Sequence, residues 1–195
     1  MIQPGTIRKM GVYYRSHPEY KEEVTRGVKE FFGIENILDT DNPLFNEWMM
    51  YDFRFTDGKG MLEKFYNENP MSIPLYRREI YKTLMENYYG FFEVLDVERF
   101  VGLSIKRIED GKIFAVSEVS ATMGLDGGDI FITRVAKVID HYELVGSDTK
   151  VIKSSQKKDA KQKKRFLKML ARLPMKSPKD AMYFLHNTHS PYFLC

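Results

Sequence analysis

From residue 90 onward the chain reads GFFEVLDVERF (90–100), VGLSIKRIEDG (101–111), KIFAVSEVS (112–120) and GDIFITRVAKVIDHYELVG (128–146). β-Branched and aromatic residues alternate with polar ones in these runs, which is typical of strands with one buried face. Turn residues separate the runs, and the Asp110-Gly111 step accepts the positive φ of a tight hairpin. Strands this short with connections this tight predict a small antiparallel β-sheet or barrel-like module over 90–152.

The residues before this module carry helical patterns instead. Residues 19–32, EYKEEVTRGVKEFF, place apolar side chains three to four apart, with Gly33 where the helix would stop. Ser16 and Glu19 have the spacing of a capping box. Two more helices are predicted, over 61–69 and in the run LYRREIYKTLMENYYGFF (75–92). The expected fold class is therefore α+β, with a helical N-terminal half (1–89), the β module (90–152) and a C-terminal region (153–195).

Charge separates that C-terminal region from the rest of the chain. Residues 153–179, KSSQKKDAKQKKRFLKMLARLPMKSPK, hold eleven Lys and Arg and one acid, a net charge of +10, whereas residues 1–152 carry a net charge of −6. We call residues 153–179 the basic arm. Such a local field attracts phosphate backbones or anionic surfaces. A solvated linker, or a clamp onto the acidic body, is the alternative use of the same charge.

Within the basic arm, the pattern over 157–173 predicts a basic amphipathic helix, followed by an aromatic tail that ends at residue 195. The apolar side, expected to bind the body or a protein partner, consists of Phe166, Leu167, Leu170 and Leu173. The residues expected to contact a nucleic-acid backbone are Lys157, Lys158, Lys161, Lys163, Lys164, Arg165, Lys168 and Arg172. The β module adds basic positions that are expected to be exposed and to offer phosphate contacts, namely Lys106, Arg107, Lys112, Arg134 and Lys137, and of these Lys106, Arg107 and Arg134 are assigned to the nucleic-acid-binding site.

Length and composition exclude several classes of protein. The 195 residues, 43% of them hydrophobic, suit a globular protein that needs no staples for its core. No apolar run reaches the length of a membrane span, and the N-terminus lacks the apolar region of a secretory signal, so a cytoplasmic location is expected. Cys195 is the single cysteine, which excludes an intrachain disulfide and a multi-cysteine zinc site.

Motifs for catalysis or metal binding are weak. His186 and His189 could share a metal on a helix, but a convincing third ligand is missing. The run from Asp39 to Asn42 starts like a calcium loop and then lacks its Gly and Glu. The chain has no nucleophile elbow, Walker loop or dinucleotide motif, and His141 fits a half-buried strand position better than a base. We therefore assign no catalytic residue, no metal and no cofactor.

An aromatic-rich segment precedes the β module, and it admits two interpretations. The aromatic residues concerned are Trp48, Tyr51, Phe53, Phe55, Phe65 and Tyr66. They could form a platform on which bases or a peptide stack. Aromatic residues at such spacings fill a core more often, so the core is the favoured interpretation.

A set of short motifs carries a resemblance to a known family. The motifs are FNEWMMYD (45–52), DGKGML (57–62), FEV (92–94), GGD (127–129) and RV (134–135). Together they resemble an uncharacterised bacterial region that often precedes a SEC-C zinc motif, over roughly residues 44–146. Gly60 stands where that pattern usually has Thr, and the zinc motif itself is absent. The resemblance implies an architecture and an accessory or adaptor role, without a catalytic residue to transfer.

The leading functional hypothesis is a non-enzymatic accessory protein that binds RNA or DNA backbone through the basic arm. One alternative is a protein–protein adaptor whose amphipathic helix docks on a partner. Attachment to a membrane surface is a second alternative, because basic amphipathic helices also bind anionic lipid. An unrecognised enzyme is a third.

Overall fold

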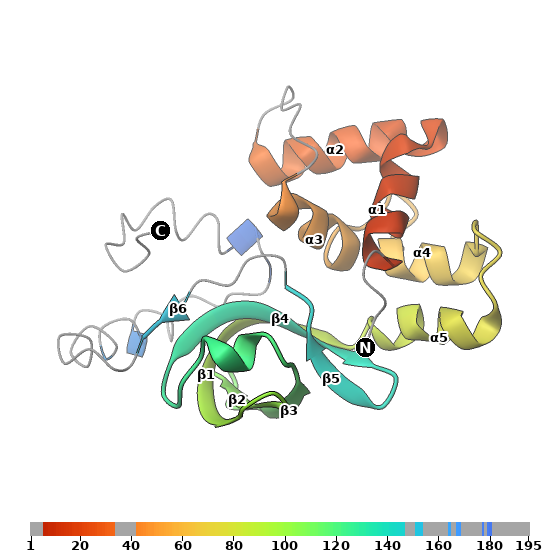
Figure 1. Cartoon of the computed structure of the whole chain (residues 1–195). Helices are drawn as coiled ribbons and strands as arrows, with labels where there is room; N and C mark the ends of the chain where they lie inside the picture. Colours follow the sequence, from red (N-terminus) through yellow and green to blue (C-terminus); the bar gives the residue numbers. More distant parts are fainter. Residues whose placement is uncertain are drawn as a thin grey trace. The chain divides into compact units, whose positions relative to one another are not determined.

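A computed structural model describes residues 6–33, 42–146 and 151–153, together with Lys164, Leu167, Lys168, Ser177, Lys179 and Asp180 (Figure 1). The chain divides into two compact units, Met1–Glu86 and Asn87–Cys195. The first contains the helices α1 to α5 and the second contains the strands, so the predicted α+β class is confirmed. None of the helices built from the described residues combines the length and apolar composition that a membrane crossing requires.

The helical unit has five α-helices and one 3₁₀ turn among its described residues. In chain order they are α1 (Thr6–Ser16), η1 (Pro18–Tyr20), α2 (Lys21–Phe32), α3 (Pro43–Tyr51), α4 (Met61–Glu68) and α5 (Leu75–Thr83). Gly33 ends α2 with a left-handed φ of 76°, as predicted. The predicted capping box is wrong, because Ser16 is still inside α1 and its hydroxyl donates to Val12 O. Pro18 starts the next turn without a side-chain cap.

Aromatic side chains form the core of the helical unit. Asn42 caps α3 by accepting hydrogen bonds from Leu44 N and Phe45 N at 3.0 and 3.1 Å. This cap fixes the start of a helix in which Phe45 and Trp48 are buried. Trp48 packs against Phe53 with ring centroids 5.3 Å apart. The first unit therefore holds a core of its own.

The second unit is a single sheet. Its elements are β1 (Asn87–Glu98), β2 (Gly102–Arg107), β3 (Ile113–Ser117), η2 (Ala121–Met123), β4 (Ile130–Val138), β5 (His141–Leu144) and β6 (Val151–Ile152). The strand order is β1-β2-β3-β5-β4-β6, and β1 also pairs with β4. The pairings of β1 to β5 therefore form a closed circuit. One of them, β3 with β5, is parallel, so the sheet is mixed rather than antiparallel throughout.

The first strand takes part in both halves of this circuit. Residues 87–93 of β1 pair with β4, and residues 92–98 pair with β2 across a bulge between Val94 and Asp96. Inward-facing side chains fill the interior with a cluster whose buried members are Phe92, Val94, Leu103, Ile105, Phe114, Val116, Leu125, Phe131 and Val135. Gly102 lies so close to β3 that a Cβ there would stand 2.3 Å from Val116 O.

The change from helix to strand comes earlier than the sequence pattern predicts. The helix predicted over 75–92 ends at Thr83, and β1 begins at Asn87. Tyr88 and Tyr89, expected within the helical run, pair with β4 at Val135 and Arg134. Aromatic residues favour strands, and pairing with β4 stabilises the strand conformation here over the helix that the local pattern predicts.

Candidate nucleic-acid interface

Three described residues of the basic arm show how its central part is presented. Lys164, Leu167 and Lys168 have helical backbones. Both lysines are exposed, and Leu167, which this spacing places next to them on the same side of a helix, is half-buried. The other residues predicted for the arm lie outside the described residues: Lys157, Lys158, Lys161, Lys163, Arg165, Arg172, Phe166, Leu170 and Leu173.

The start of the basic arm is fixed to the sheet. Strand β6 pairs with β4 at Ile130 and Phe131, and Lys153 follows it directly. The Lys153 ammonium donates to Asp129 Oδ2 at 2.8 Å and to the carbonyl oxygen of Gly124. The Asp129 side chain is 1% exposed and also accepts a hydrogen bond from Asp126 N at 3.0 Å. A buried carboxylate thus holds the first cation of the arm.

The loop that receives Lys153 is itself braced. Arg99 donates to Leu125 O at 3.2 Å and forms an ion pair with Asp126 at 2.7 Å. Gly128 N donates to Val94 O at 2.7 Å, and Val94 N donates to Asp129 O at 2.8 Å. We call the contact between Lys153 and Asp129 the anchor. The sequence interpretation missed it, although it quoted both residues: Asp129 in the GGD turn, and Lys153 as the first residue of the basic arm.

Two of the predicted cations of the β module already have acidic partners. Lys106 forms an ion pair with Glu93 on the neighbouring strand at 3.1 Å. Arg107, at the end of β2, donates to both carboxylate oxygens of Asp110 in the turn that follows, at 2.9 and 2.5 Å. The hydrogen bonds that Arg107 donates to Asp110 raise the pKa of Arg107, and the same bonds lower the pKa of Asp110. A phosphate would have to compete with these carboxylates.

The expectation of an exposed cation at Arg134 is wrong. Its side chain is 1% exposed, and it contacts Asn87 Oδ1 and stacks over the Tyr89 ring at 5.1 Å. Lys112 is exposed, with its ammonium 3.9 Å from the centre of the Tyr88 ring. Lys137 is half-buried. The β module therefore presents fewer available cations than its composition suggests.

The aromatic cluster of the helical unit is core, as the favoured interpretation holds. Trp48, Tyr51, Phe53, Phe55 and Phe65 are each at most 7% exposed. The sixth residue considered, Tyr66, is half-buried and donates to Glu79 Oε1 at 2.9 Å. Rings buried in this way cannot offer a face to a base.

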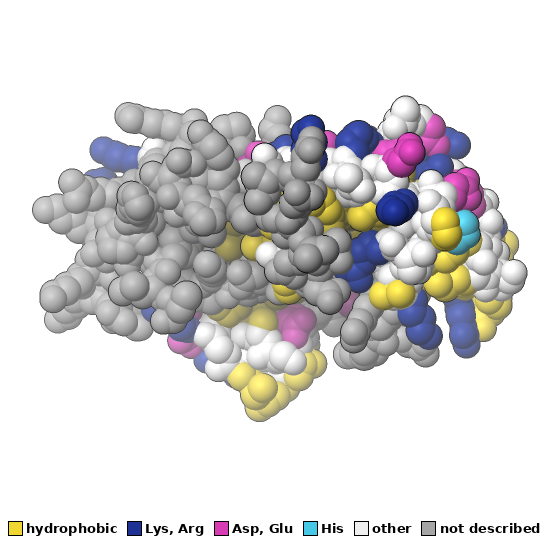
Figure 2. All heavy atoms as spheres, turned by 90° about the horizontal axis from the view of Figure 1, so that it is seen from above, with side chains coloured by type: hydrophobic (Ala, Val, Ile, Leu, Met, Phe, Trp, Pro, Cys, Tyr) yellow, Lys and Arg dark blue, Asp and Glu magenta, His cyan; other side chains and the backbone are white. Residues whose placement is uncertain are grey.

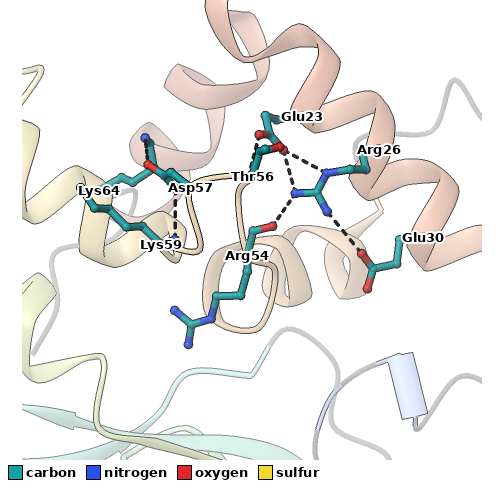
Figure 3. A network of polar contacts seen from close by, with 8 residues as sticks. All are labelled: Glu23, Arg26, Glu30, Arg54, Thr56, Asp57, Lys59 and Lys64. Carbon is teal, nitrogen blue, oxygen red and sulfur yellow. Dashed lines mark hydrogen bonds and ion pairs between the residues drawn. The ribbon is translucent and has the colours of Figure 1, made fainter.

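A network of charges on the helical unit could be taken for a catalytic centre (Figure 3). Glu23 accepts a hydrogen bond from Thr56 N at 2.8 Å and pairs with Arg26 at 2.7 Å, and Arg26 also donates to Arg54 O. Burial opposes ionisation of Glu23, but these hydrogen bonds outweigh it and lower its pKa. The network holds the turn between α3 and α4 against α2, which is a structural role.

A second part of that network centres on Lys64. Its ammonium lies 2.9 Å from Asp57 and 3.1 Å from Glu68. Desolvation would lower the pKa of Lys64, but the two carboxylates raise it above its usual range. Tyr20 donates to Glu68 at 3.0 Å, and burial together with this bond raises the Tyr20 pKa to about 12. These shifts keep Lys64 charged and Tyr20 protonated, so neither is prepared to act as a base near neutral pH.

His141 lies between two carboxylates at the start of β5. Its Nδ1 is 2.9 Å from Asp140 Oδ1, and its Nε2 is 2.8 Å from Glu143 Oε1. Both contacts raise the histidine pKa, because they favour the doubly protonated ring. Among the described residues no group of three or more His, Cys, Asp and Glu could hold a metal ion. The calcium-loop candidate at 39–41, His186, His189 and Cys195 lie outside the described residues.

Comparison of the chain with known protein families, with curated proteins and with solved structures finds no match. The resemblance to the region that precedes SEC-C motifs therefore stays a prediction. The functional argument rests on the chain itself.

Proposed function

We propose that this protein is a non-enzymatic accessory protein that binds the phosphate backbone of RNA or DNA through its basic arm. The observation that carries the proposal is the exposure of Lys164 and Lys168 on helical backbone, with the half-buried Leu167 beside them. Residues four apart lie on one face of a helix, so these cations face solvent together. A row of cations on one side of a helix binds phosphates without reading base sequence.

The charge distribution supports the arm rather than the body as the site of contact. The arm carries a net charge of +10 against −6 for residues 1–152. On the β-strand unit, Lys106 and Arg107 are already paired with acids, and Arg134 is buried. The counterions released from the nucleic acid on binding would therefore be displaced mainly by the cations of the arm.

The strand circuit of the second unit adds a fold-level argument. The order β1-β2-β3-β5-β4, closed by β1 with β4 and with a helical turn between β3 and β4, is the order found in OB-folds. Proteins with the OB-fold commonly bind oligonucleotides. Because one fold can serve many functions, this likeness supports nucleic-acid binding by analogy alone. The main argument for that function is the charge and exposure of the basic arm.

The test replaces the eight arm cations at positions 157, 158, 161, 163, 164, 165, 168 and 172 with Gln in the full chain. Lys153 is kept, since its removal would leave Asp129 without this partner. Fluorescence anisotropy with labelled single-stranded RNA, single-stranded DNA and duplex DNA at about 50 mM salt should show affinity reduced at least about a hundredfold.

The matched control is the double substitution Lys106→Gln and Lys112→Gln, which removes body cations. It should change affinity by no more than about threefold, since few phosphate contacts are lost. Equal losses in the two variants would refute the arm as the site of binding. No binding by the unchanged protein at about 50 mM salt would refute nucleic-acid binding altogether.

A further inference from the structure

The outer side of α5 carries large apolar side chains that the helical unit leaves exposed. Leu75 and Tyr76, in its first turn, are 60% and 70% exposed, and Met71, in the loop before it, is 40% exposed. The inner side of the same helix is held by Tyr81, which is 3% exposed and packs on Phe65 of α4 with ring centroids 4.8 Å apart. The helix therefore buries one side against α4 and presents the other.

The loop that leads into α5 is fixed by one side chain. Asn69 Nδ2 donates to Ile73 O at 3.1 Å, and Asn69 Oδ1 accepts from Ile73 N at 2.7 Å. Ser72 N donates to Asn69 O at 3.0 Å. These bonds hold Met71 in a defined place beside the first turn of α5.

Three cations stand among these apolar side chains. Arg77 and Lys82 are exposed, and Arg78 is half-buried. The Arg77 guanidinium lies 5.5 Å from the centre of the Tyr76 ring, and that of Arg78 lies 5.1 Å from the centre of the Tyr66 ring. Within the described part of the chain, none of the three forms an ion pair with an acid. The α5 surface, as we call it, consists of Met71, Leu75, Tyr76, Arg77, Arg78 and Lys82.

The side of the helical unit that carries α2 is charged in a different way. Figure 2 looks down on that side and shows basic and acidic side chains close together. There Arg26 pairs with Glu23 at 2.7 Å and with Glu30 at 3.8 Å. The cations of α5 lack such partners, so they are available to acids from another molecule.

The spacing along α5 selects the kind of partner. Leu75, Arg78 and Lys82 are three and seven residues apart, which places apolar and cationic side chains on one face of the helix. On a helix that lies on a membrane, apolar and basic side chains occupy opposite faces instead. A nucleic acid would use the cations and leave the aliphatic side chains of Met71 and Leu75 in water. A peptide that carries both carboxylates and apolar side chains uses the whole surface.

We propose that the α5 surface binds an acidic segment of a partner protein, in which carboxylates alternate with apolar side chains. Its carboxylates pair with Arg77 and Lys82, and its apolar side chains cover Leu75 and Tyr76. A guanidinium stacked on an aromatic ring keeps its edge free for a carboxylate. Glu79 is the one acid within residues 70–85, and it already accepts a hydrogen bond from the Tyr66 hydroxyl at 2.9 Å. This contact does not depend on the basic arm or on nucleic-acid binding.

The first test is fluorescence anisotropy with a labelled synthetic peptide built from Glu and Leu in alternating pairs. The host is the full chain with the eight arm cations replaced by Gln, because the arm itself attracts acidic peptides. The dissociation constant should be about 10 to 100 µM, as for a weak and transient contact. Peptides with Gln in place of Glu, or Ser in place of Leu, should bind at least about tenfold more weakly. No binding of the Glu–Leu peptide up to about 1 mM, or equal binding of the three peptides, would overturn the proposal.

The second test locates the binding surface. The double substitution Leu75→Ser and Lys82→Gln changes two exposed positions and should weaken binding of the Glu–Leu peptide at least about tenfold. The matched control is Ile113→Ser with Lys112→Gln, since Ile113 is also 60% exposed and lies beside an exposed lysine in the other unit. The control should change the affinity by no more than about twofold. Equal losses in the two variants would rule out the α5 surface as the binding site.

A charge reversal tests the choice of an acidic partner. Arg77→Glu with Lys82→Glu should make the protein prefer a Lys–Leu peptide over the Glu–Leu peptide, and an unchanged preference would contradict the proposal. In the chain with its natural arm, Leu75→Ser with Lys82→Gln should leave binding to single-stranded RNA and flotation with phosphatidylserine vesicles unchanged. A loss of either would mean that the α5 surface serves a nucleic acid or a membrane and not a peptide.

Discussion

The substitution Lys153→Met tests the anchor of the basic arm most sharply. It removes the cation that lies 2.8 Å from Asp129 Oδ2 and leaves a carboxylate that is 1% exposed. Breaking a fully buried pair costs about 3 to 5 kcal/mol, whereas exposed pairs contribute about 0 to 1 kcal/mol. The Lys153 side chain is 37% exposed, so solvent screens part of the interaction. In the variant, Asp129 still accepts the hydrogen bond from Asp126 N. We therefore expect Lys153→Met to lower the free energy of unfolding by about 2 kcal/mol.

The assay is urea and thermal unfolding followed by circular dichroism. A loss of about 2 kcal/mol should lower the melting temperature by roughly 4 to 8 °C in a chain of this length. Lys106→Met is the matched control, because Lys106 pairs with the partly exposed Glu93 at 3.1 Å. Its loss should not exceed about 1 kcal/mol. Equal losses for Lys153→Met and Lys106→Met would refute the reasoning.

A double-mutant cycle isolates the pair itself. Asp129→Asn alone should also destabilise the chain, because it leaves the Lys153 ammonium without its closest carboxylate. The double variant should lose less than the sum of the single losses, with a coupling energy of about 1 kcal/mol or more. Additive losses would mean that the anchor contributes nothing as a pair.

Three further outcomes follow from the described contacts. Gly102→Ala should lower the free energy of unfolding by about 1 to 3 kcal/mol in urea melts, because its Cβ would collide with Val116 O, and an unchanged value would contradict that geometry. The His141 pKa, read by NMR titration, should lie above 6.5; the stabilisation it contributes should be complete below pH 6.5 and vanish as pH rises through the folded value, whereas a pKa at or below 6.5 would contradict the two contacts. Tyr20→Phe should cost about 1 kcal/mol through its lost bond to Glu68, and an ultraviolet titration that ionises Tyr20 near pH 10 would contradict the raised pKa.

The features of the fold that the sequence predicts correctly are mostly local ones, such as turns and helix ends. The Asp110-Gly111 step forms the hairpin it indicates, with Gly111 at a φ of 74°, and Gly33 ends α2 as expected. Periodicity also separates the helical residues from the β module. The periodicity gives the wrong prediction at Tyr88 and Tyr89, because these residues pair with β4. A pairing between residues far apart in the chain cannot be read from the local sequence pattern.

The sequence predicts which residues belong to the candidate site better than it predicts how they are arranged in space. The count of cations identifies the arm, but it cannot tell that Arg134 is buried or that Lys106 has an acidic partner. Those facts depend on which strands become neighbours. The same holds for the anchor, where Lys153 and Asp129 stand 24 positions apart in the chain.

The salt dependence of nucleic-acid affinity tests the central proposal most directly. Dissociation constants for single-stranded RNA and duplex DNA would be measured with the full chain between about 50 and about 200 mM salt. Eight phosphate contacts from the arm predict a slope of log affinity against log salt of about −5.6 for single-stranded RNA and about −7.2 for duplex DNA, reduced to near zero in the eight-residue Gln variant. A slope shallower than about −2, or one that the Gln variant leaves unchanged, would contradict backbone binding by the arm.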